Sequence, residues 1–227
     1  MNNLRKKIAI LAISLVSFLG FQSVSNASPE GFSFGLAINE AGFMGSGKET
    51  MTGSGASTTQ KDITEEDGAF KDSVTSAFVE YSVNDTISVG VEMFPEDVTT
   101  PENLNVQQVN SADVNNTVKA SFKDHTTLYA NINMPFNTYL KLGYVMVDVA
   151  TQESLATGSK YNDVDTNGIT AGLGYQYNAD NGVFARFEVS VTEYDDVSAT
   201  STVDSSKQVE VKEMYGAIGS FKIGKSF

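Results

Sequence analysis

The 227-residue sequence contains no cysteine, no tryptophan and a single histidine. Without cysteine, disulfides, thiol nucleophiles and cysteine metal sites are excluded. Without tryptophan, tyrosine and phenylalanine must supply any aromatic side chains at a membrane interface. Cations are scarce as well, because 15 Lys and Arg stand against 28 Asp and Glu for a formal net charge of −13. This charge argues against binding to nucleic acid through a basic surface.

Long hydrophobic runs are also missing, apart from residues 8–21 near the N-terminus. That run covers roughly 14 residues, whereas a helix that spans a bilayer needs about 20. It follows the three cations at 5–7 and precedes a small-x-small sequence at 25–27. We therefore expect 1–27 to be a secretory signal peptide rather than a transmembrane anchor. Any membrane-spanning part of the remaining chain must consist of strands.

Eight segments alternate between apolar and polar residues with a period of two, as strands do. The segments are 32–43, 73–83, 87–94, 118–134, 139–150, 168–177, 183–194 and 209–227. The connections after the first, third, fifth and seventh segments are long and polar, and the other three are a few residues long. Long outer loops that alternate with short periplasmic turns are typical of outer-membrane β-barrels.

Each segment has one apolar face and one polar face. Ile169, Ala171 and Leu173 lie on the apolar face of their segment, for example, whereas Arg186 and Glu188 lie on the polar face of theirs. A soluble lipocalin-like barrel would bury the apolar face, and a membrane barrel would expose it to lipid. The rhythm of the connections and the presence of both charge signs on the polar face favour an apolar exterior.

The last segment resembles the closing strand of bacterial outer-membrane β-barrels, in which a terminal aromatic signature is read by the barrel assembly machinery. The residues that carry this signature are Tyr215, Phe221, Ile223 and Phe227. The sequences G-L-G-Y-Q-Y at 172–177 and F-E-V-S-V-T-E-Y at 187–194 are similar to late strands of the same group. The chain thus resembles the small outer-membrane β-barrel family of the OmpA-barrel, OmpX and opacity-protein type.

This resemblance implies an all-β fold, an eight-stranded antiparallel up-and-down transmembrane β-barrel over residues 28–227. It also implies a location in the cell outer membrane, in contact with its lipids and with lipopolysaccharide. We expect neither a peptidoglycan-binding domain after the barrel nor a cofactor.

Six charged residues of the polar face lie within about five residues of the short-turn ends of their strands. At roughly 3.3 Å per residue they fall within one layer, below about 17 Å. The interior of an eight-stranded barrel is nearly filled by side chains, and an unpaired buried ion costs several kcal/mol. We therefore predict an ion-pair network that fills the lumen; the alternative is a set of surface charges on a soluble sheet. The six residues are Glu80, Glu92, Lys141, Arg186, Glu188 and Lys222.

Two weaker patterns concern metal binding and catalysis. Asp163, Asp165 and Asn167 match the first half of a calcium-binding loop, but Gly174 stands where the bidentate Glu is required. They are a weak calcium candidate in an outer loop, and the alternative is a polar turn. Lipid A-modifying barrels use a histidine with a serine and an acid. Around His125, the neighbouring Asp124 would point to the opposite face and Ser121 would lie about 13 Å along the strand. We therefore expect no catalytic residue, and we expect His125 to be an isolated histidine at the rim of the barrel.

The sequence therefore predicts a non-enzymatic structural or surface barrel. Its acidic outer loops could contact divalent cations, other cells or phage. Three alternatives stay open: a narrow porin-like channel for ions or small solutes, a soluble periplasmic lipocalin-like binder, and a lipid-modifying enzyme.

Overall fold

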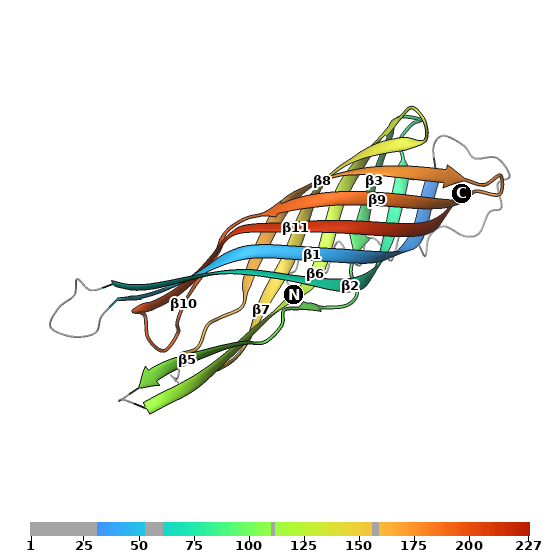
Figure 1. The fold of residues 1–227 in the computed structure, drawn as a ribbon. Coiled ribbons are helices and arrows are strands. Elements are labelled where there is room, and N and C mark those ends of the chain that lie inside the picture. Colours follow the sequence, from blue (N-terminus) through green and yellow to red (C-terminus); the bar gives the residue numbers. More distant parts are fainter. Residues whose placement is uncertain (1–30, 53–60, 110–111, 156–158) are drawn as a thin grey trace.

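The computed structural model describes residues 31–52, 61–109, 112–155 and 159–227 (Figure 1). The predicted signal peptide, residues 1–27, lies outside this range. Within it, no helix is long and apolar enough to cross a bilayer.

Eight antiparallel strands form a closed ring, as predicted. Seven neighbouring pairs follow the chain around the ring, and pairing of the first strand with the last closes it. Closure continues to the end of the chain, where the Phe227 N–H donates to the Phe32 carbonyl at 2.9 Å. The ring consists of β1 (Gly31–Thr52), β2 (Lys61–Ser82), β3 (Ile87–Met93), β6 (Ala112–Met134), β7 (Thr138–Leu155), β8 (Val164–Asn178), β9 (Val183–Tyr194) and β11 (Lys207–Ser226).

The apolar faces of the strands point outward. Leu36, Ile169 and Val189 have 68%, 63% and 65% of their surfaces exposed, while the charged residues of the opposite faces are buried. A soluble barrel would bury these aliphatic side chains, so the lipocalin-like alternative is wrong. The prediction of an apolar exterior is confirmed.

The exposed apolar belt has the height of a membrane. On β9 it lies between Val183 and Glu193, which are separated by about 33 Å of strand at 3.3 Å per residue. A strand tilt of about 40° reduces this to roughly 25 Å along the barrel axis, the usual height of the apolar band of an outer-membrane barrel. Exposed Tyr81 and Tyr177 lie near the short-turn edge, and exposed Tyr215 lies near the outer edge. Tyrosines therefore occupy interface positions in a chain without tryptophan.

The strands are longer than the alternation predicted. The expected loop after Phe43 is largely a hairpin, because β1 and β2 stay paired as far as Thr52 and Lys61. The expected loop over 95–116 contains β4 (Val98–Thr99) and β5 (Asn103–Val109), both paired with β6. A further strand, β10 (Val197–Thr200), pairs with β11. Water surrounds both faces of a strand outside a membrane, so period-two hydrophobicity does not mark these extensions. Figure 1 shows them as two arms projecting from one end of the barrel.

Candidate functional site

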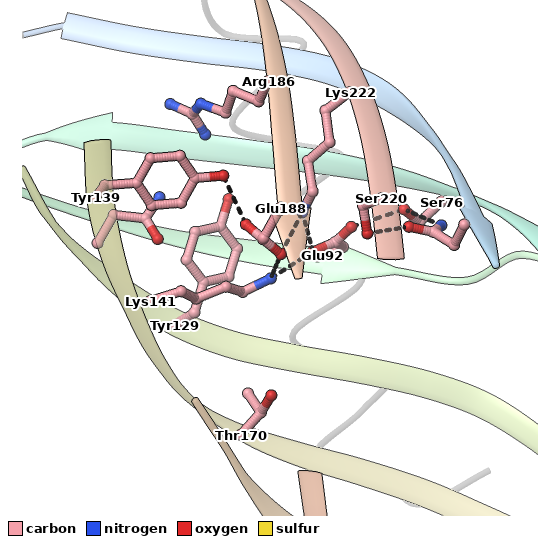
Figure 2. A network of polar contacts seen from close by, with 12 residues as sticks. Ser76, Glu92, Tyr129, Tyr139, Lys141, Thr170, Arg186, Glu188, Ser220 and Lys222 are labelled. Carbon is pink, nitrogen blue, oxygen red and sulfur yellow. Dashed lines mark hydrogen bonds and ion pairs between the residues drawn. The ribbon is translucent and has the colours of Figure 1, made fainter. Parts of the chain in front are cut away.

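Four charged side chains in the lumen alternate in sign around a closed circuit (Figure 2). Glu92 on β3 accepts hydrogen bonds from Lys141 of β7 at 2.8 Å and from Lys222 of β11 at 2.7 Å. Glu188 on β9 lies 2.9 Å from Lys141 and 3.1 Å from Lys222. Each cation thus contacts both anions, and all four side chains are buried. The circuit ties four strands together through the middle of the barrel.

A bidentate pair lies beside this circuit. Arg186 donates to Glu80 from Nη1 at 2.8 Å and from Nη2 at 2.7 Å. The guanidinium also lies 4.6 Å from the ring centre of Phe184 and 5.3 Å from that of Tyr139. Arg186 and Lys222 are register partners on neighbouring strands. Arg186 pairs with Glu80, whereas Lys222 shares Glu92 and Glu188 with Lys141. The three acids and three bases together have no net formal charge.

Two tyrosines extend the network to the barrel wall. The Tyr139 hydroxyl donates to Glu188 at 2.8 Å, as drawn in Figure 2. The Tyr129 hydroxyl donates to Glu80 at 3.2 Å, and the Asn131 amide donates to the same carboxylate at 2.8 Å. These neutral donors use carboxylate lone pairs that the cations leave open, which is the condition for burying a charge at low cost.

Glycines opposite the two tyrosines make the packing possible. Gly174 is the register partner of Tyr139, and a Cβ at Gly174 would lie 2.1 Å from the tyrosine ring. Gly90 stands opposite Tyr129 in the same way, with a distance of 2.6 Å. The missing side chain lets each ring lie flat across the neighbouring strand. The same arrangement recurs in the cross-strand pairs Phe78–Gly35 and Phe184–Gly224.

Polar side chains continue the network toward the outer end. Ser76 donates to Glu92 at 2.7 Å and accepts from the Asn39 amide at 3.0 Å, while Ser220 donates to the Asn39 side-chain oxygen at 2.6 Å. A cavity of about 10 Å³ lies beside them and beside the charged circuit, and His125 also lines it. A space of this size holds about one water molecule.

An apolar cap fills the outer part of the lumen. Its buried core consists of Ala41, Val74, Phe94, Val98 and Ile218. Half-buried Phe43, Phe70 and Phe122 pack against this core with their rings stacked 5.1 to 6.0 Å apart. The cap lies where the ladder between β2 and β3 has ended, since its outermost pair is Ala77 with Met93. Beyond the end of this ladder, the packed side chains of the cap close the lumen.

His125 lies inside the lumen, not at the rim where an isolated histidine was expected. It keeps the inward phase of Thr127 and Tyr129. A register shift between Lys123 and Thr126, with Asp124 at a φ of 51°, changes the phase farther out, where Phe122 packs against the apolar cap. Its ring contacts Phe94 edge-on at 4.4 Å, and its Nε2 lies 3.4 Å from the Tyr194 hydroxyl.

The calcium candidates lie in or beside a strand rather than in a loop. Asp165 and Asn167 belong to β8, and Asp163 precedes it and accepts a hydrogen bond from the Thr151 N–H at 3.3 Å. A strand spreads alternate residues along a line instead of wrapping them around an ion. Across the described residues, no three His, Cys, Asp or Glu side chains converge into a metal site.

The residues of the expected assembly signal lie on the outer face of β11. Tyr215, Phe221 and Ile223 are exposed toward the membrane side. The Phe227 ring stacks on Phe34 of β1 at 5.2 Å, across the seam that closes the barrel.

The period-two alternation of the sequence predicts the six charged residues of the lumen, but it does not single out several of their hydrogen-bond partners. Tyr129 lies between Leu128 and Ala130, and Tyr139 precedes Leu140, so residue type alone does not distinguish these tyrosines from those of the belt. The period-two pattern carries the usable signal, because it puts both on the polar face. Their glycine partners could be identified only with the register known.

No protein-family model matches the sequence, and no curated protein matches it. Several solved structures are similar in fold. The outer membrane protein OprG from Pseudomonas aeruginosa aligns with a TM-score of 0.52 at 15% identity, covering 87% of this chain and 97% of that one. The outer membrane protease OmpT from Escherichia coli aligns with a TM-score of 0.48 at 10% identity, covering 90% and 99%. Ail, the attachment invasion locus protein of Yersinia pestis, aligns with a TM-score of 0.38 at 11% identity, covering 85% and 99%.

At these identities the likeness concerns the fold, and the alignment with OprG carries it. The resemblance to small outer-membrane β-barrels is thus confirmed for the architecture. The fold and the exposed apolar belt together support a location in the outer membrane. The chain has the fold of an outer-membrane β-barrel of eight strands.

Proposed function

We propose that the protein is a non-enzymatic surface barrel of the outer membrane whose lumen is sealed. The observation that carries this proposal is the neutral network of three acids and three bases between the short-turn end and the apolar cap. One cavity beside the network, with a volume of about 10 Å³, holds about one water molecule. A conducting pore would have to break several buried ion pairs at about 3–5 kcal/mol for each charge left unpaired.

The outer arms are the surface that the barrel presents to its surroundings. On β1 the strand continues from Glu40 to Thr52, about 40 Å at 3.3 Å per residue. Acidic residues are frequent along these arms, and some pair with lysines, as Glu65 does with Lys48 at 3.1 Å. We propose that the arms meet divalent cations, other cells or phage.

Conductance in planar bilayers tests the seal. The refolded protein should be electrically silent, and Arg186→Gln should increase conductance events because it opens the neutral pair with Glu80. The Lys48→Gln variant, altered in an exposed ion pair of the outer arm, should stay silent. Steady conductance of the unaltered protein, with ion selectivity that changes in Glu92→Gln, would instead support the narrow channel.

The absence of lipid-modifying activity is part of the proposal. His125 is buried between Phe94 and Tyr194, and the cavity beside it is far too small for an acyl chain. We expect the mass of lipid A to be the same in cells with the protein, without it, and with His125→Ala. A mass difference that requires His125 would show an enzyme.

We also propose that outer-membrane lipids and lipopolysaccharide surround the belt, and that the barrel assembly machinery recognises the last strand. The support is the exposed row of Tyr215, Phe221 and Ile223, together with the seam contact of Phe227 with Phe34.

A further inference from the structure

The connection between β6 and β7 has an unusual backbone for its sequence. Met134 pairs with Thr138, so only residues 135–137 connect the two strands. Phe136 and Asn137 have φ values of 64° and 58°, in the left-handed region. Asn tolerates this region, whereas a bulky aromatic residue is rarely found there because the conformation is strained.

Hydrogen bonds from Thr138 Oγ1 to the Pro135 carbonyl and from the Gln176 N–H to the Asn137 carbonyl, both at 2.8 Å, hold the backbone of the turn, but the Phe136 side chain does not pack into the barrel. The Phe136 side chain is 90% exposed, more than any other large apolar side chain among the described residues. A strained residue that persists at an exposed position points to a function outside the fold itself.

The other two short turns differ from this one in charge. The turn over 83–86 contains Asp85 and the turn over 179–182 contains Asp180, and both carboxylates are exposed. Residues 135–137 contain no ionisable side chain. The three turns at the same end of the barrel are therefore not equivalent: two suit water and one suits an apolar surrounding.

The apolar belt leads directly to Phe136. Met134, the last exposed apolar residue of β6, is only two residues away, or roughly 7 Å of strand. On the other side, the Asn137 carbonyl accepts a hydrogen bond from the Gln176 N–H at 2.8 Å, which puts exposed Tyr175 and Tyr177 beside the turn. The interfacial layer on each side of a bilayer is about 5–7 Å thick, so Phe136 is within its reach.

We propose that Phe136 inserts into the interfacial layer of the periplasmic leaflet and anchors the β6–β7 side of the barrel to phospholipid. Aromatic side chains are favoured at this depth, and this chain has no tryptophan for the purpose. The acidic turns stay in water, so the short-turn rim meets the leaflet unevenly and lies deepest at Phe136. This inference rests on the proposed outer-membrane barrel.

Because the chain lacks tryptophan, each single substitution to tryptophan introduces one unique tryptophan fluorophore. We would compare Phe136→Trp with Phe187→Trp in the middle of the belt and Asp85→Trp in an acidic turn. Each protein is folded into phosphatidylcholine vesicles, with and without phosphatidylcholine brominated near the carbonyl end of its acyl chains, and iodide serves as the aqueous quencher. The gel mobility of unboiled samples checks that each variant is folded.

The anchor predicts that brominated lipid quenches Phe136→Trp at least half as strongly as Phe187→Trp, with a blue-shifted emission and little quenching by iodide. Asp85→Trp should show the reverse. If brominated lipid quenches Phe187→Trp but Phe136→Trp behaves like Asp85→Trp, the membrane anchor is refuted. The exposed Phe136 would then be explained by contact with a water-soluble partner. If Phe187→Trp is not quenched by lipid either, the membrane barrel itself fails.

Discussion

The buried pair of Arg186 and Glu80 offers the sharpest test of how the lumen is stabilised. In Arg186→Gln, Glu80 loses two hydrogen bonds of 2.8 and 2.7 Å and its counter-charge, but keeps those from Asn131 and Tyr129. Removing one partner of a buried pair typically costs about 3–5 kcal/mol. Because two neutral donors remain, we expect the lower end, about 3 kcal/mol, or roughly a hundredfold change in the unfolding equilibrium.

Urea unfolding of protein folded in vesicles, followed by circular dichroism and gel mobility, measures this free energy. The matched control is Lys48→Gln, whose partner Glu65 is largely exposed, so its loss should cost less than about 1 kcal/mol. Adding Glu80→Gln to Arg186→Gln should recover much of the stability, because the uncompensated charge is then removed. An Arg186→Gln loss no larger than that of Lys48→Gln, and unchanged by the second substitution, would refute the reasoning.

Three further predictions follow from the packing, the seam and the strand geometry. Gly174→Ala puts a methyl group 2.1 Å from the Tyr139 ring and should lower the free energy of unfolding by about 1–3 kcal/mol. The control Gly219→Ala, whose methyl group meets no atom within 4 Å, should change it by less than about 0.5 kcal/mol. The midpoint of the heat-induced gel shift compares the two variants, and equal midpoints would contradict the packing account. Deletion of Phe227 should lower the amount of folded barrel in cell membranes while leaving the purified protein able to fold in detergent; unchanged membrane levels would argue against recognition of the last strand. Asp163→Asn should not change the response of the unfolding midpoint to about 1 mM calcium, because Asp163 and Asp165 do not converge. A clear rise in the midpoint with calcium that Asp163→Asn abolishes would establish the site.

The membrane part of the fold could be predicted because successive residues of each strand face lipid and lumen in turn. Lipid selects Leu173 and Val189 on one face, and the lumen selects Glu188 on the other. Beyond Met44 both faces of β1 are partly exposed, so the same pattern fades although the backbone pairing continues to Thr52. Hydrophobic periodicity therefore locates the belt and misses the arms.

The charged lumen could be predicted as a layer but not as a set of partners. Glu80 and Arg186 are 106 residues apart in the chain, and the stagger between strands decides that they meet. The same stagger divides the six charges into a circuit of four and a pair. A sequence read one strand at a time contains no information on this stagger.

An irregularity in β6 shows a second limit. Strict alternation from Leu128 assigns a face to each residue of β6, but the irregularity between Lys123 and Thr126 interrupts it. Asp124 takes a positive φ there, a conformation that Asp accepts more readily than most residues. Alternation from Leu128 puts His125 in the lumen, as the structure does, but it puts Phe122 on the outer face, whereas Phe122 packs against the apolar cap.

The central claim is a closed barrel with its apolar face turned outward to lipid. Electrophoresis of the membrane-extracted protein in SDS, boiled and unboiled, tests it most directly, because a closed membrane barrel resists SDS until it is heated. The account predicts that detergent is needed for extraction and that the unboiled protein migrates faster than the boiled one. A single mobility for both samples, from protein released in soluble form without detergent, would contradict it.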